Sequence, residues 1–300
     1  MPNTTLPPLI ESLRLHQWAK NGLLFVPAAV GQVATEPHVA WTLVAAFLAF
    51  SLTASGNYLL NDLIDLESDR RHPAKSGRPL ASGQLSAPVA AVAAALLMAA
   101  GLWIAFLLIN QPFALMLVAY VLLALAYSKF FKRLLVLDVL VLAALYGLRL
   151  LAGGAAVDVA VSSWLMIFAM FFFVSMAFAK RMAEQDAMRA VLPAERDAAR
   201  AYQTADRAAF AAIGPASGML AVLVLALYVS SDAIRARYPH PDFLWMLCPL
   251  LFYWVIRVWV FALRGELHHD PVVFALRDRV SYAVIVAMAA VFLLAAGAGD

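Results

Sequence analysis

Nine long apolar segments, joined by short polar connections, constrain the fold of this chain more than any other feature. A transmembrane helix needs about 20 apolar residues. These runs are apolar on all sides, unlike the alternating strands of a membrane barrel. The pattern predicts an all-α, polytopic membrane bundle of about nine transmembrane helices. The segments lie at residues 20–35, 40–60, 87–109, 112–130, 134–155, 161–180, 214–231, 243–263 and 280–298.

The composition excludes the main soluble classes. Of the 300 residues, 64% are apolar and 14% are charged, against about 45–50% and about 25% in soluble domains. A soluble fold of this size cannot bury so much apolar surface, so soluble enzymes, disordered chains and nucleic-acid binders are excluded. We expect one integral-membrane domain over residues 1–300, with no soluble domain and no cleavable signal peptide. The single cysteine, Cys248, excludes an intramolecular disulfide and Cys-based metal motifs.

The distribution of basic residues indicates the orientation. With nine spans, 18 of the 22 Lys and Arg residues fall in one alternating set of connections, and only Arg235 and Arg237 fall in the other. Cytoplasmic connections are enriched in Lys and Arg. We therefore expect a bacterial-type inner-membrane protein whose N-terminus and active site are cytoplasmic and whose C-terminus lies outside. The same distribution explains the net charge of +3 without an acidic macromolecular partner.

Acidic residues cluster directly after the second apolar segment. If that helix continues, Asn61, Asp65 and Asp69 lie one turn apart on one face, with Asp62 beside them. Carboxylate and amide oxygens suit Mg²⁺, which proteins bind through one or two carboxylates together with substrate phosphates. The bases that follow suit the remaining phosphate oxygens. The alternative is a solvated loop whose charges neutralise one another.

These residues resemble the UbiA superfamily of intramembrane prenyltransferases. Asn61-Asp62-x-x-Asp65-x-x-x-Asp69 at the end of a second helix is similar to the first Asp-rich motif of that superfamily. The N-terminal and loop motifs are most similar to the branch that contains decaprenyl-phosphate phosphoribosyltransferase. The other residues that carry the resemblance are Arg14-Leu-His16-Gln17-Trp18-Ala-Lys20-Asn21, Arg71-His72-Pro73-x-Lys75-x-x-Arg78-Pro79, Tyr127-Ser128, Lys132-Arg133, Asp138, Arg149, Gly153-Gly154, Lys180-Arg181-x-x-Glu184, and Asp270-Pro271 followed by Arg277-Asp278-Arg279.

The resemblance implies a helical bundle around a central cavity that opens to the cytoplasmic face and to lipid. It implies that Mg²⁺ on the Asp-rich motif holds a diphosphate leaving group. The implied catalytic residues are Asp62, Asp65, Asp69 and Glu184, and the implied metal site consists of Asn61 with the same three aspartates. The expected substrate-binding residues are Lys20, Asn21, Asn61, Arg71, Lys75, Arg78, Tyr127, Lys132, Arg149, Lys180 and Arg181.

A second motif separates two activities within this resemblance. Aromatic prenyltransferases of the superfamily carry a second D-x-x-x-D at the end of the sixth helix, where this chain has Lys180-Arg181-Met-Ala-Glu184. Two bases suit a substrate with an additional phosphate, as in the phosphoribosyl branch. Lys180 and Arg181 can equally anchor a helix end in the headgroup region. Ser76 departs from the branch, since the resemblance predicts a base directly after Lys75.

Two charges fall inside the fifth apolar segment. We expect Asp138, near the cytoplasmic edge, to join the polar site with Lys132 or Arg133, whereas Arg149 lies deeper. Intramembrane charges usually face a cavity or a partner, so Arg149 either binds another helix or lines the cavity. Tyr127 is either a substrate contact or an aromatic residue of the membrane interface.

Three functions follow as hypotheses. The first is Mg²⁺-dependent transfer of 5-phosphoribose from phosphoribosyl pyrophosphate to a polyprenyl phosphate, a step of cell-envelope synthesis. The second keeps the metal but moves a prenyl group from prenyl diphosphate to an aromatic or other small acceptor. The third is a membrane transporter, against which we find no inverted sequence repeat. The expected partners are a polyprenyl lipid, a diphosphate-bearing substrate and membrane lipid, and homo-oligomerisation is left open.

Overall fold

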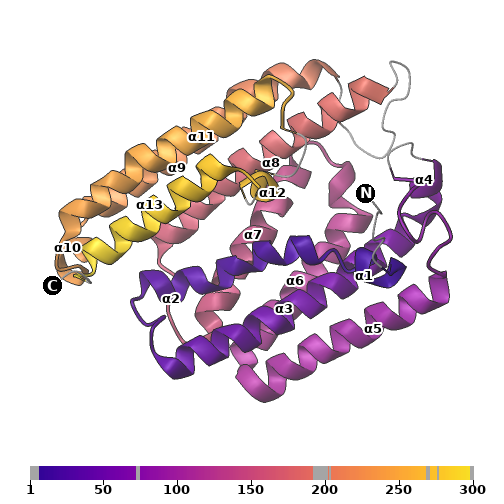
Figure 1. The fold of residues 1–300 in the computed structure, drawn as a ribbon, viewed down its shortest axis with the longest axis horizontal. Helices are drawn as coiled ribbons and strands as arrows, with labels where there is room; N and C mark the ends of the chain where they lie inside the picture. Colours follow the sequence, from indigo (N-terminus) through magenta and orange to yellow (C-terminus); the bar gives the residue numbers. More distant parts are fainter. Residues whose placement is uncertain are drawn as a thin grey trace. The chain divides into compact units, whose positions relative to one another are not determined.

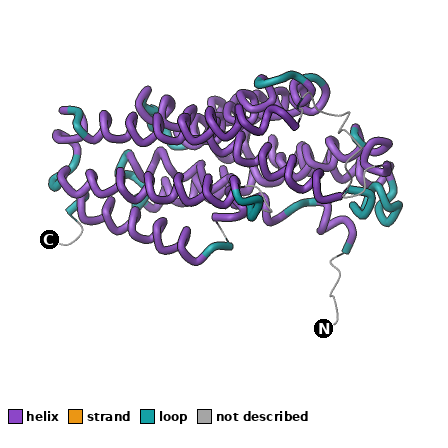
Figure 2. Tube along the Cα trace, turned by 90° about the horizontal axis from the view of Figure 1, so that it is seen from above, coloured by secondary structure: helices purple, strands orange, loops and turns teal. Residues whose placement is uncertain are grey.

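A computed structural model describes residues 7–71, 75–191, 202, 204–267, 271–275 and 277–297 of the chain. Helices dominate these residues, and no strand occurs among them (Figures 1 and 2). The prediction of an all-α membrane bundle is confirmed. Within the described ranges, seven helical segments are long and apolar enough to cross a membrane, so the expected number of about nine is approximate. These segments are Pro37–Ile64, Ala87–Ile109, Gln111–Arg133, Leu137–Ala156, Ser163–Asp186, Arg207–Val229 and Pro241–Leu263.

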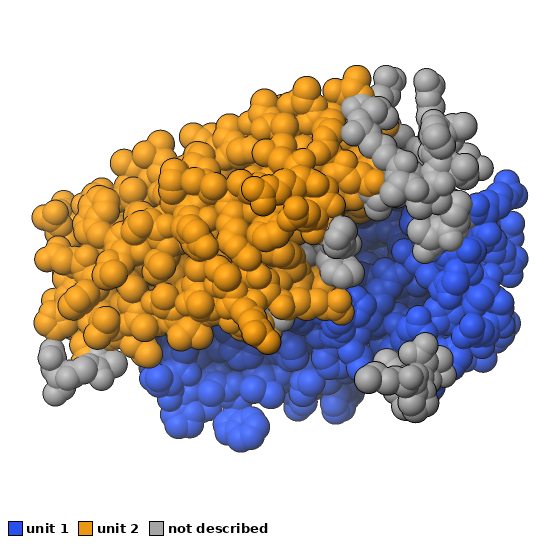
Figure 3. All heavy atoms as spheres, turned by 45° about the horizontal axis from the view of Figure 1, so that its top comes forward, with its two compact units in different colours: residues 1–134, 148–161 blue, residues 135–147, 162–300 orange. Residues whose placement is uncertain are grey.

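The chain divides into two units, which Figure 3 colours separately. Unit 1 comprises residues 1–134 and 148–161, and unit 2 comprises residues 135–147 and 162–300. Helix α7 (Leu137–Ala156) contributes its N-terminal half to unit 2 and its C-terminal half to unit 1.

Unit 1 is organised around the long helix α3. Its elements are α1 (Pro8–Ser12), η1 (Leu15–Phe25), α2 (Val26–Val30), α3 (Pro37–Ile64), α4 (Leu66–Arg71), α5 (Ala87–Ile104) with the π-helical η2 (Ala105–Ile109), α6 (Gln111–Lys129) and η3 (Phe131–Arg133). Helix α3 packs along α5, beside which it runs in Figure 1, and also contacts α6 and η1. A Cβ on Gly101 would lie 2.5 Å from the carbonyl oxygen of Ala49, and one on Gly56 would lie 2.8 Å from that of Ala94. Small residues therefore bring α3 and α5 into close contact, as is common between membrane helices.

The first expected span differs from a single membrane helix. Residues 20–35 contain the end of a 3₁₀-helical stretch, η1, followed by the five-residue helix α2. Pro27 lies at the start of α2, where it lacks the N–H that would bond back to the preceding turn. After α2, Gln32 has a φ of 61°, which turns the chain before α3 begins. The buried polar residues Lys20 and Asn21 also lie within this stretch.

Unit 2 contains the remaining helices. They are α8 (Ser163–Val191), η4 (Thr204–Asp206), α9 (Arg207–Val229), α10 (Asp232–Arg237), η5 (Pro241–Met246), α11 (Leu247–Leu263), α12 (Pro271–Ala275) and α13 (Arg279–Ala295). Helix α9 packs against α8 and α11. Where they meet, Trp259 donates its Nε1–H to Ser175 Oγ at 2.9 Å, and Ser175 donates to the Gly214 carbonyl at 2.7 Å. Gly214 leaves room for the Trp259 ring, because a Cβ there would lie 2.0 Å from it.

Helix starts follow the local sequence. Proline occupies one of the first two positions of α3, α5 and α6. Because N–H groups at these positions have no acceptor within the helix, the missing N–H of proline costs no hydrogen bond there. Asn110 caps α6 by accepting a hydrogen bond from Phe113 N at 2.8 Å, and its amide donates to the Ala155 carbonyl. Asp278 caps α13 in the same way, accepting from Ser281 N at 2.7 Å.

Candidate functional site

The Asp-rich motif lies where α3 ends and α4 begins. Asp65 is the C-terminal cap residue of α3, and its N–H donates to the Asn61 carbonyl at 2.9 Å. The Asp69 N–H donates to the Asp65 carbonyl at 2.8 Å. These two bonds keep the helical turn across the junction, so Asn61, Asp65 and Asp69 follow one another at the spacing that the sequence predicts. Asp62 and Asp69 are buried, whereas Asn61 and Asp65 are half-buried.

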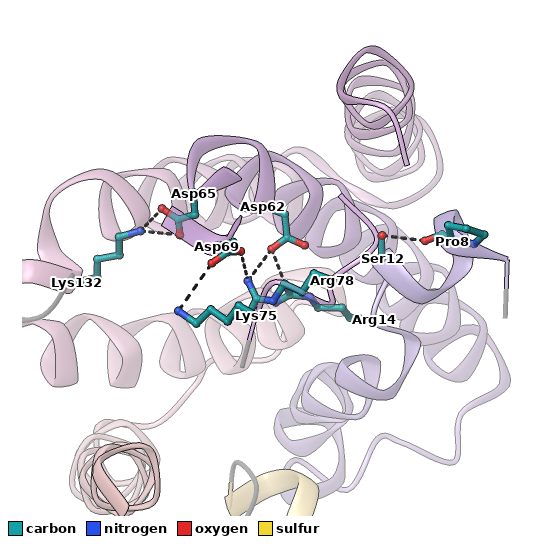
Figure 4. A network of polar contacts seen from close by, with 9 residues as sticks. All are labelled: Pro8, Ser12, Arg14, Asp62, Asp65, Asp69, Lys75, Arg78 and Lys132. Carbon is teal, nitrogen blue, oxygen red and sulfur yellow. Dashed lines mark hydrogen bonds and ion pairs between the residues drawn. The ribbon is translucent and has the colours of Figure 1, made fainter. Parts of the chain in front are cut away.

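Basic side chains neutralise Asp62 and Asp69. Arg14 Nη2 lies 2.5 Å from Asp62 Oδ1, and Arg78 Nη1 lies 3.3 Å from the same oxygen. Arg78 Nη1 also donates to Asp69 Oδ2 at 2.6 Å, and Lys75 Nζ lies 3.9 Å from Asp69 Oδ1 (Figure 4). Paired in this way, two buried carboxylates are compensated within the protein. Arg14 belongs to the N-terminal motif of the sequence, but it was not among the expected site residues.

Lys132 holds the third carboxylate. Its Nζ lies 2.6 Å from Oδ1 and 2.7 Å from Oδ2 of Asp65 (Figure 4). Lys132 belongs to η3, which follows α6. The ion pair therefore connects the end of α6 with the end of α3, across 67 residues of sequence. Lys132, one of the expected substrate-binding residues, therefore lies against the Asp-rich motif, and its role in binding substrate stays a prediction.

The three aspartates have the oxygen donors that Mg²⁺ prefers, and in this structure each of them is paired with a base instead of facing a shared metal ion. In the part of the chain that the structure describes, no group of three or more His, Cys, Asp or Glu side chains is arranged to hold one. The ion pairs with Arg14, Arg78 and Lys132 explain this, because they orient the carboxylates toward bases. Binding a cation here requires these bases to exchange partners.

A second polar cluster in unit 1 surrounds Arg149. Its Nε donates to Asn21 Oδ1 at 2.9 Å and its Nη2 to the Tyr120 hydroxyl at 3.2 Å. The guanidinium also lies over the rings of Phe50 and Tyr120, 5.3 and 4.9 Å from their centroids. Asn21 donates in turn to Ser51 Oγ. Arg149 thus binds side chains of η1 and α6, whereas the sequence left open whether it binds carbonyl groups of another helix or lines a cavity.

The expected second motif forms a separate network in unit 2. Arg181 is 2% exposed and donates from Nε to Asp138 Oδ2 at 2.7 Å and from Nη1 to Glu184 Oε2 at 2.5 Å. Asp138 also accepts a hydrogen bond from the Tyr202 hydroxyl, which itself accepts from Val136 N at 3.0 Å. Burial and the hydrogen bond to Asp138 raise the pKa of the Tyr202 phenol above its ordinary value. Asp138 therefore binds Arg181, not Lys132 or Arg133 as expected.

The structure also describes four other expected site residues. Lys20 is buried in η1, Tyr127 and Lys180 are half-buried in α6 and α8, and Arg71 is exposed, 3.9 Å from Glu67. His72, Pro73 and Asp270, which belong to the motifs of the resemblance, lie outside the described residues. No pattern in the sequence points to Tyr120 or Tyr202, since each is a single tyrosine whose partners lie far along the chain.

Comparison with known proteins decides the family. The model of the UbiA prenyltransferase family matches residues 24–277. The chain belongs to the UbiA prenyltransferase family. Members of this family are named prenyltransferases, and the seven helices among the described residues that are long and apolar enough to cross a membrane agree with an integral membrane protein.

Three relatives have similar sequences. The chain is 37% identical over 288 residues to the uncharacterized protein y4nM of Sinorhizobium fredii, covering 95% of this chain but 55% of that protein. It is 37% identical over 280 residues to the nodulation protein NoeC of Azorhizobium caulinodans, covering 93% and 90%. It is 36% identical over 187 residues to decaprenyl-phosphate phosphoribosyltransferase of Mycolicibacterium smegmatis, covering 61% and 58%. The chain thus spans little more than half the length of the first and third relatives.

Solved structures share the UbiA fold. A UbiA homolog from Archaeoglobus fulgidus bound to GPP and Mg²⁺ matches with a TM-score of 0.68 at 20% identity, over 95% of this chain and 99% of that one. The same homolog bound to DMAPP and Mg²⁺ matches with a TM-score of 0.69 at 19% identity, over 95% and 98%.

Proposed function

We propose that this UbiA-family protein transfers 5-phosphoribose from phosphoribosyl pyrophosphate to a polyprenyl phosphate, with loss of pyrophosphate. The observation that carries the proposal is the number of bases at the three aspartates. Arg14, Lys75, Arg78 and Lys132 all lie against carboxylates of the motif. Such a cluster suits two substrates that together bring a diphosphate, a sugar phosphate and a lipid phosphate.

Unit 2 supports the same substrate class. Where aromatic prenyltransferases of the superfamily carry two acids, this chain has the Lys180–Arg181 pair with Glu184. Asp138 and Glu184 hold Arg181 from two sides, which fixes the direction of its guanidinium. The 36% identity to a decaprenyl-phosphate phosphoribosyltransferase adds support.

The proposed reaction needs little general acid–base catalysis from the protein. An anionic oxygen of the lipid phosphate attacks C1 of the ribose, and the bond from C1 to the diphosphate oxygen breaks. The electron pair leaves with pyrophosphate, so no proton has to be removed from the acceptor. Positioning of the two substrates and stabilisation of charge then supply most of the rate enhancement. We assign the stabilisation of the departing pyrophosphate to Arg14, Lys75 and Arg78.

We further propose that the protein requires Mg²⁺ and that the whole chain is one transferase domain with a cytoplasmic N-terminus and active site. The hard oxygen donors of Asp62, Asp65 and Asp69, with Asn61, support the metal. The bound Mg²⁺ of the A. fulgidus homolog supports it as well. Bound Mg²⁺ would neutralise diphosphate charge. The excess of bases in alternate connections supports the orientation.

One assay tests the proposal. Purified protein in lipid is given Mg²⁺ with radiolabelled phosphoribosyl pyrophosphate and polyprenyl phosphate, or with prenyl diphosphate and an aromatic acid. We expect a labelled lipid product in the first mixture. Product in the second mixture alone would replace this function by prenyl transfer, which is the runner-up because the family is named for it. Omitting Mg²⁺ from the first mixture tests the metal.

A further inference from the structure

Asn57 is a buried polar residue that the fold itself does not use. It lies in the middle of α3, one helical turn before Asn61, and its side chain is almost completely enclosed, with 6% of the residue exposed. Among the described residues, its side-chain oxygen Oδ1 has no hydrogen-bond partner. A buried acceptor without a donor costs free energy, so most native groups of this kind are paired.

Other polar groups of α3 are satisfied. Thr53, which is fully buried, donates to the carbonyl one turn before it. Ser55 both donates to the Leu13 carbonyl and accepts from the Trp18 indole. These polar side chains of α3 form hydrogen bonds within the protein. Among the described residues of this part of α3, Asn57 Oδ1 is the exception.

The position of Asn57 on α3 connects the two polar clusters of unit 1. Phe50, seven residues earlier, packs against Tyr120 of α6 with the rings tilted and their centroids 4.6 Å apart. Asp65, eight residues later, binds Lys132 just after α6. Along α3, Asn57 therefore lies between the Arg149 cluster and the Asp-rich motif.

We propose that Asn57 Oδ1 accepts a hydrogen bond from a ribose hydroxyl of the diphosphate donor and so selects a sugar donor over a prenyl donor. This inference rests on the proposed function. An amide oxygen needs a hydrogen-bond donor. Phosphate oxygens at neutral pH only accept, and a prenyl chain offers no donor, whereas ribose offers hydroxyl groups next to the carbon that reacts. Sites built to bond a substrate hydroxyl discriminate strongly against analogues that lack it.

The test combines two variants with three substrates. Asn57→Leu keeps the branched shape without the acceptor, and Asn57→Ala is a second variant in case Leu overfills the site. Thr53→Val is the matched control, since it removes a buried polar group from the same helix whose bond is internal. Each protein is assayed with phosphoribosyl pyrophosphate and with its 2-deoxy and 3-deoxy analogues. Melting temperature and binding of Mn²⁺ alone are measured in parallel.

We expect the wild type to show a KM for one deoxy analogue that is about tenfold above the KM for the parent, the effect of one lost hydrogen bond. In Asn57→Leu or Asn57→Ala, the KM for the parent substrate should rise to the value that the wild type shows for that deoxy analogue. All three substrates should then have similar KM values, while kcat changes little. At least one of the two variants should melt at or above the wild-type temperature, because an unpaired buried group has been removed. Thr53→Val should keep the wild-type discrimination.

Four results would overturn the inference. Variants that keep the wild-type discrimination would show that Asn57 does not contact the hydroxyl. Lower melting temperatures in both variants would make Asn57 a structural residue, and weaker Mn²⁺ binding would make it a metal ligand. A wild-type protein that uses prenyl diphosphate alone would remove both the proposed function and this role. That last outcome is seen in the wild type and is therefore distinct from the other three.

Discussion

Lys132 Nζ lies within 2.7 Å of both carboxylate oxygens of Asp65. The ammonium group thus occupies the side of the carboxylate to which a metal ion would bind. Both residues belong to unit 1, and their side chains are 12% and 22% exposed. Water screens such a pair only in part, so a divalent cation has to compete with Lys132 for Asp65.

This competition predicts that Lys132→Met binds divalent cations more tightly than the wild type. Removing the ammonium group frees Asp65, and we expect about a fivefold gain in affinity for Mn²⁺ alone, equivalent to about 1 kcal/mol. Affinity for inorganic pyrophosphate should fall in the same variant, because one phosphate-binding base is lost. Titration of Mn²⁺ followed by electron paramagnetic resonance measures the first effect. Lys129→Met, at an exposed position of the same helix end, is the control and should change neither. Unchanged Mn²⁺ affinity in Lys132→Met would contradict the competition.

Asp65→Asn should abolish turnover while the protein still inserts and folds. The substitution keeps the size of the side chain but removes the charge that both Lys132 and a cation require. We expect a loss of at least about 100-fold in rate, the size seen when a group that stabilises transition-state charge is removed. Glu67→Gln is the matched control, since Glu67 belongs to the same turn but its side chain is 73% exposed. Turnover retained in Asp65→Asn would take this residue out of the site.

The sequence predicted those parts of the molecule whose signal is local. The long apolar runs predicted most of the spans. The spacing of Asn61, Asp65 and Asp69 predicted the helical turn that the backbone bonds of the junction confirm. The length of the first apolar run predicted a span, and Pro27 and the left-handed Gln32 divide it into shorter pieces.

Pairings between distant segments could not be predicted in the same way. Arg14 meets Asp62 across 48 residues, and Tyr202 meets Asp138 across 64. Neither pair leaves a periodic pattern in the sequence, since the packing of separate helices sets both. The expected partner of Asp138 was wrong for the same reason. The position of Asp138 near the start of its helix narrowed the choice of base, but the packing of α7 and α8 within unit 2 selects Arg181.

Tyr202→Phe should destabilise unit 2, and the effect should depend on pH. The hydroxyl bonds both Asp138 and Val136 N, so its loss should lower the free energy of unfolding by about 1–2 kcal/mol at neutral pH. Burial and the Asp138 hydrogen bond raise the folded-state pKa of Tyr202. The stabilisation is therefore complete below the ordinary pKa of about 10 and is lost as the pH rises through the folded value. Melting temperatures of the wild type and the variant should converge above pH 10. Tyr253→Phe, at an exposed tyrosine of α11, should show no such convergence, and a constant difference between wild type and Tyr202→Phe would refute the assignment.

For Asp278 we predict a stabilisation of the fold that depends on pH in the opposite direction. Burial opposes its ionisation, but hydrogen bonds from Arg257 and Ser281 outweigh that effect and lower the pKa of Asp278 below its ordinary value of 3.8. Arg257 reaches both carboxylate oxygens, at 2.6 and 3.0 Å, and the same carboxylate caps α13. Because the folded pKa lies below the unfolded one, the stabilisation is complete above the unfolded pKa and is lost as the pH falls through the folded value.

The expected result is that Asp278→Asn melts below the wild type at pH 7 and that the difference narrows as the pH falls below about 4. Asp242→Asn, at an acid that neither caps α13 nor binds Arg257 in the described structure, is the matched control and should give a difference that does not narrow. Arg257→Lys separates the two roles of the carboxylate, because Lys keeps the charge but cannot make both bonds, while the cap to Ser281 N survives. We expect it to lose only part of what Asp278→Ala loses, because Ala removes the cap as well as the bonds to Arg257. Equal losses in Arg257→Lys and Asp278→Ala would mean that the two bonds to Arg257, and not the cap, carry the whole effect.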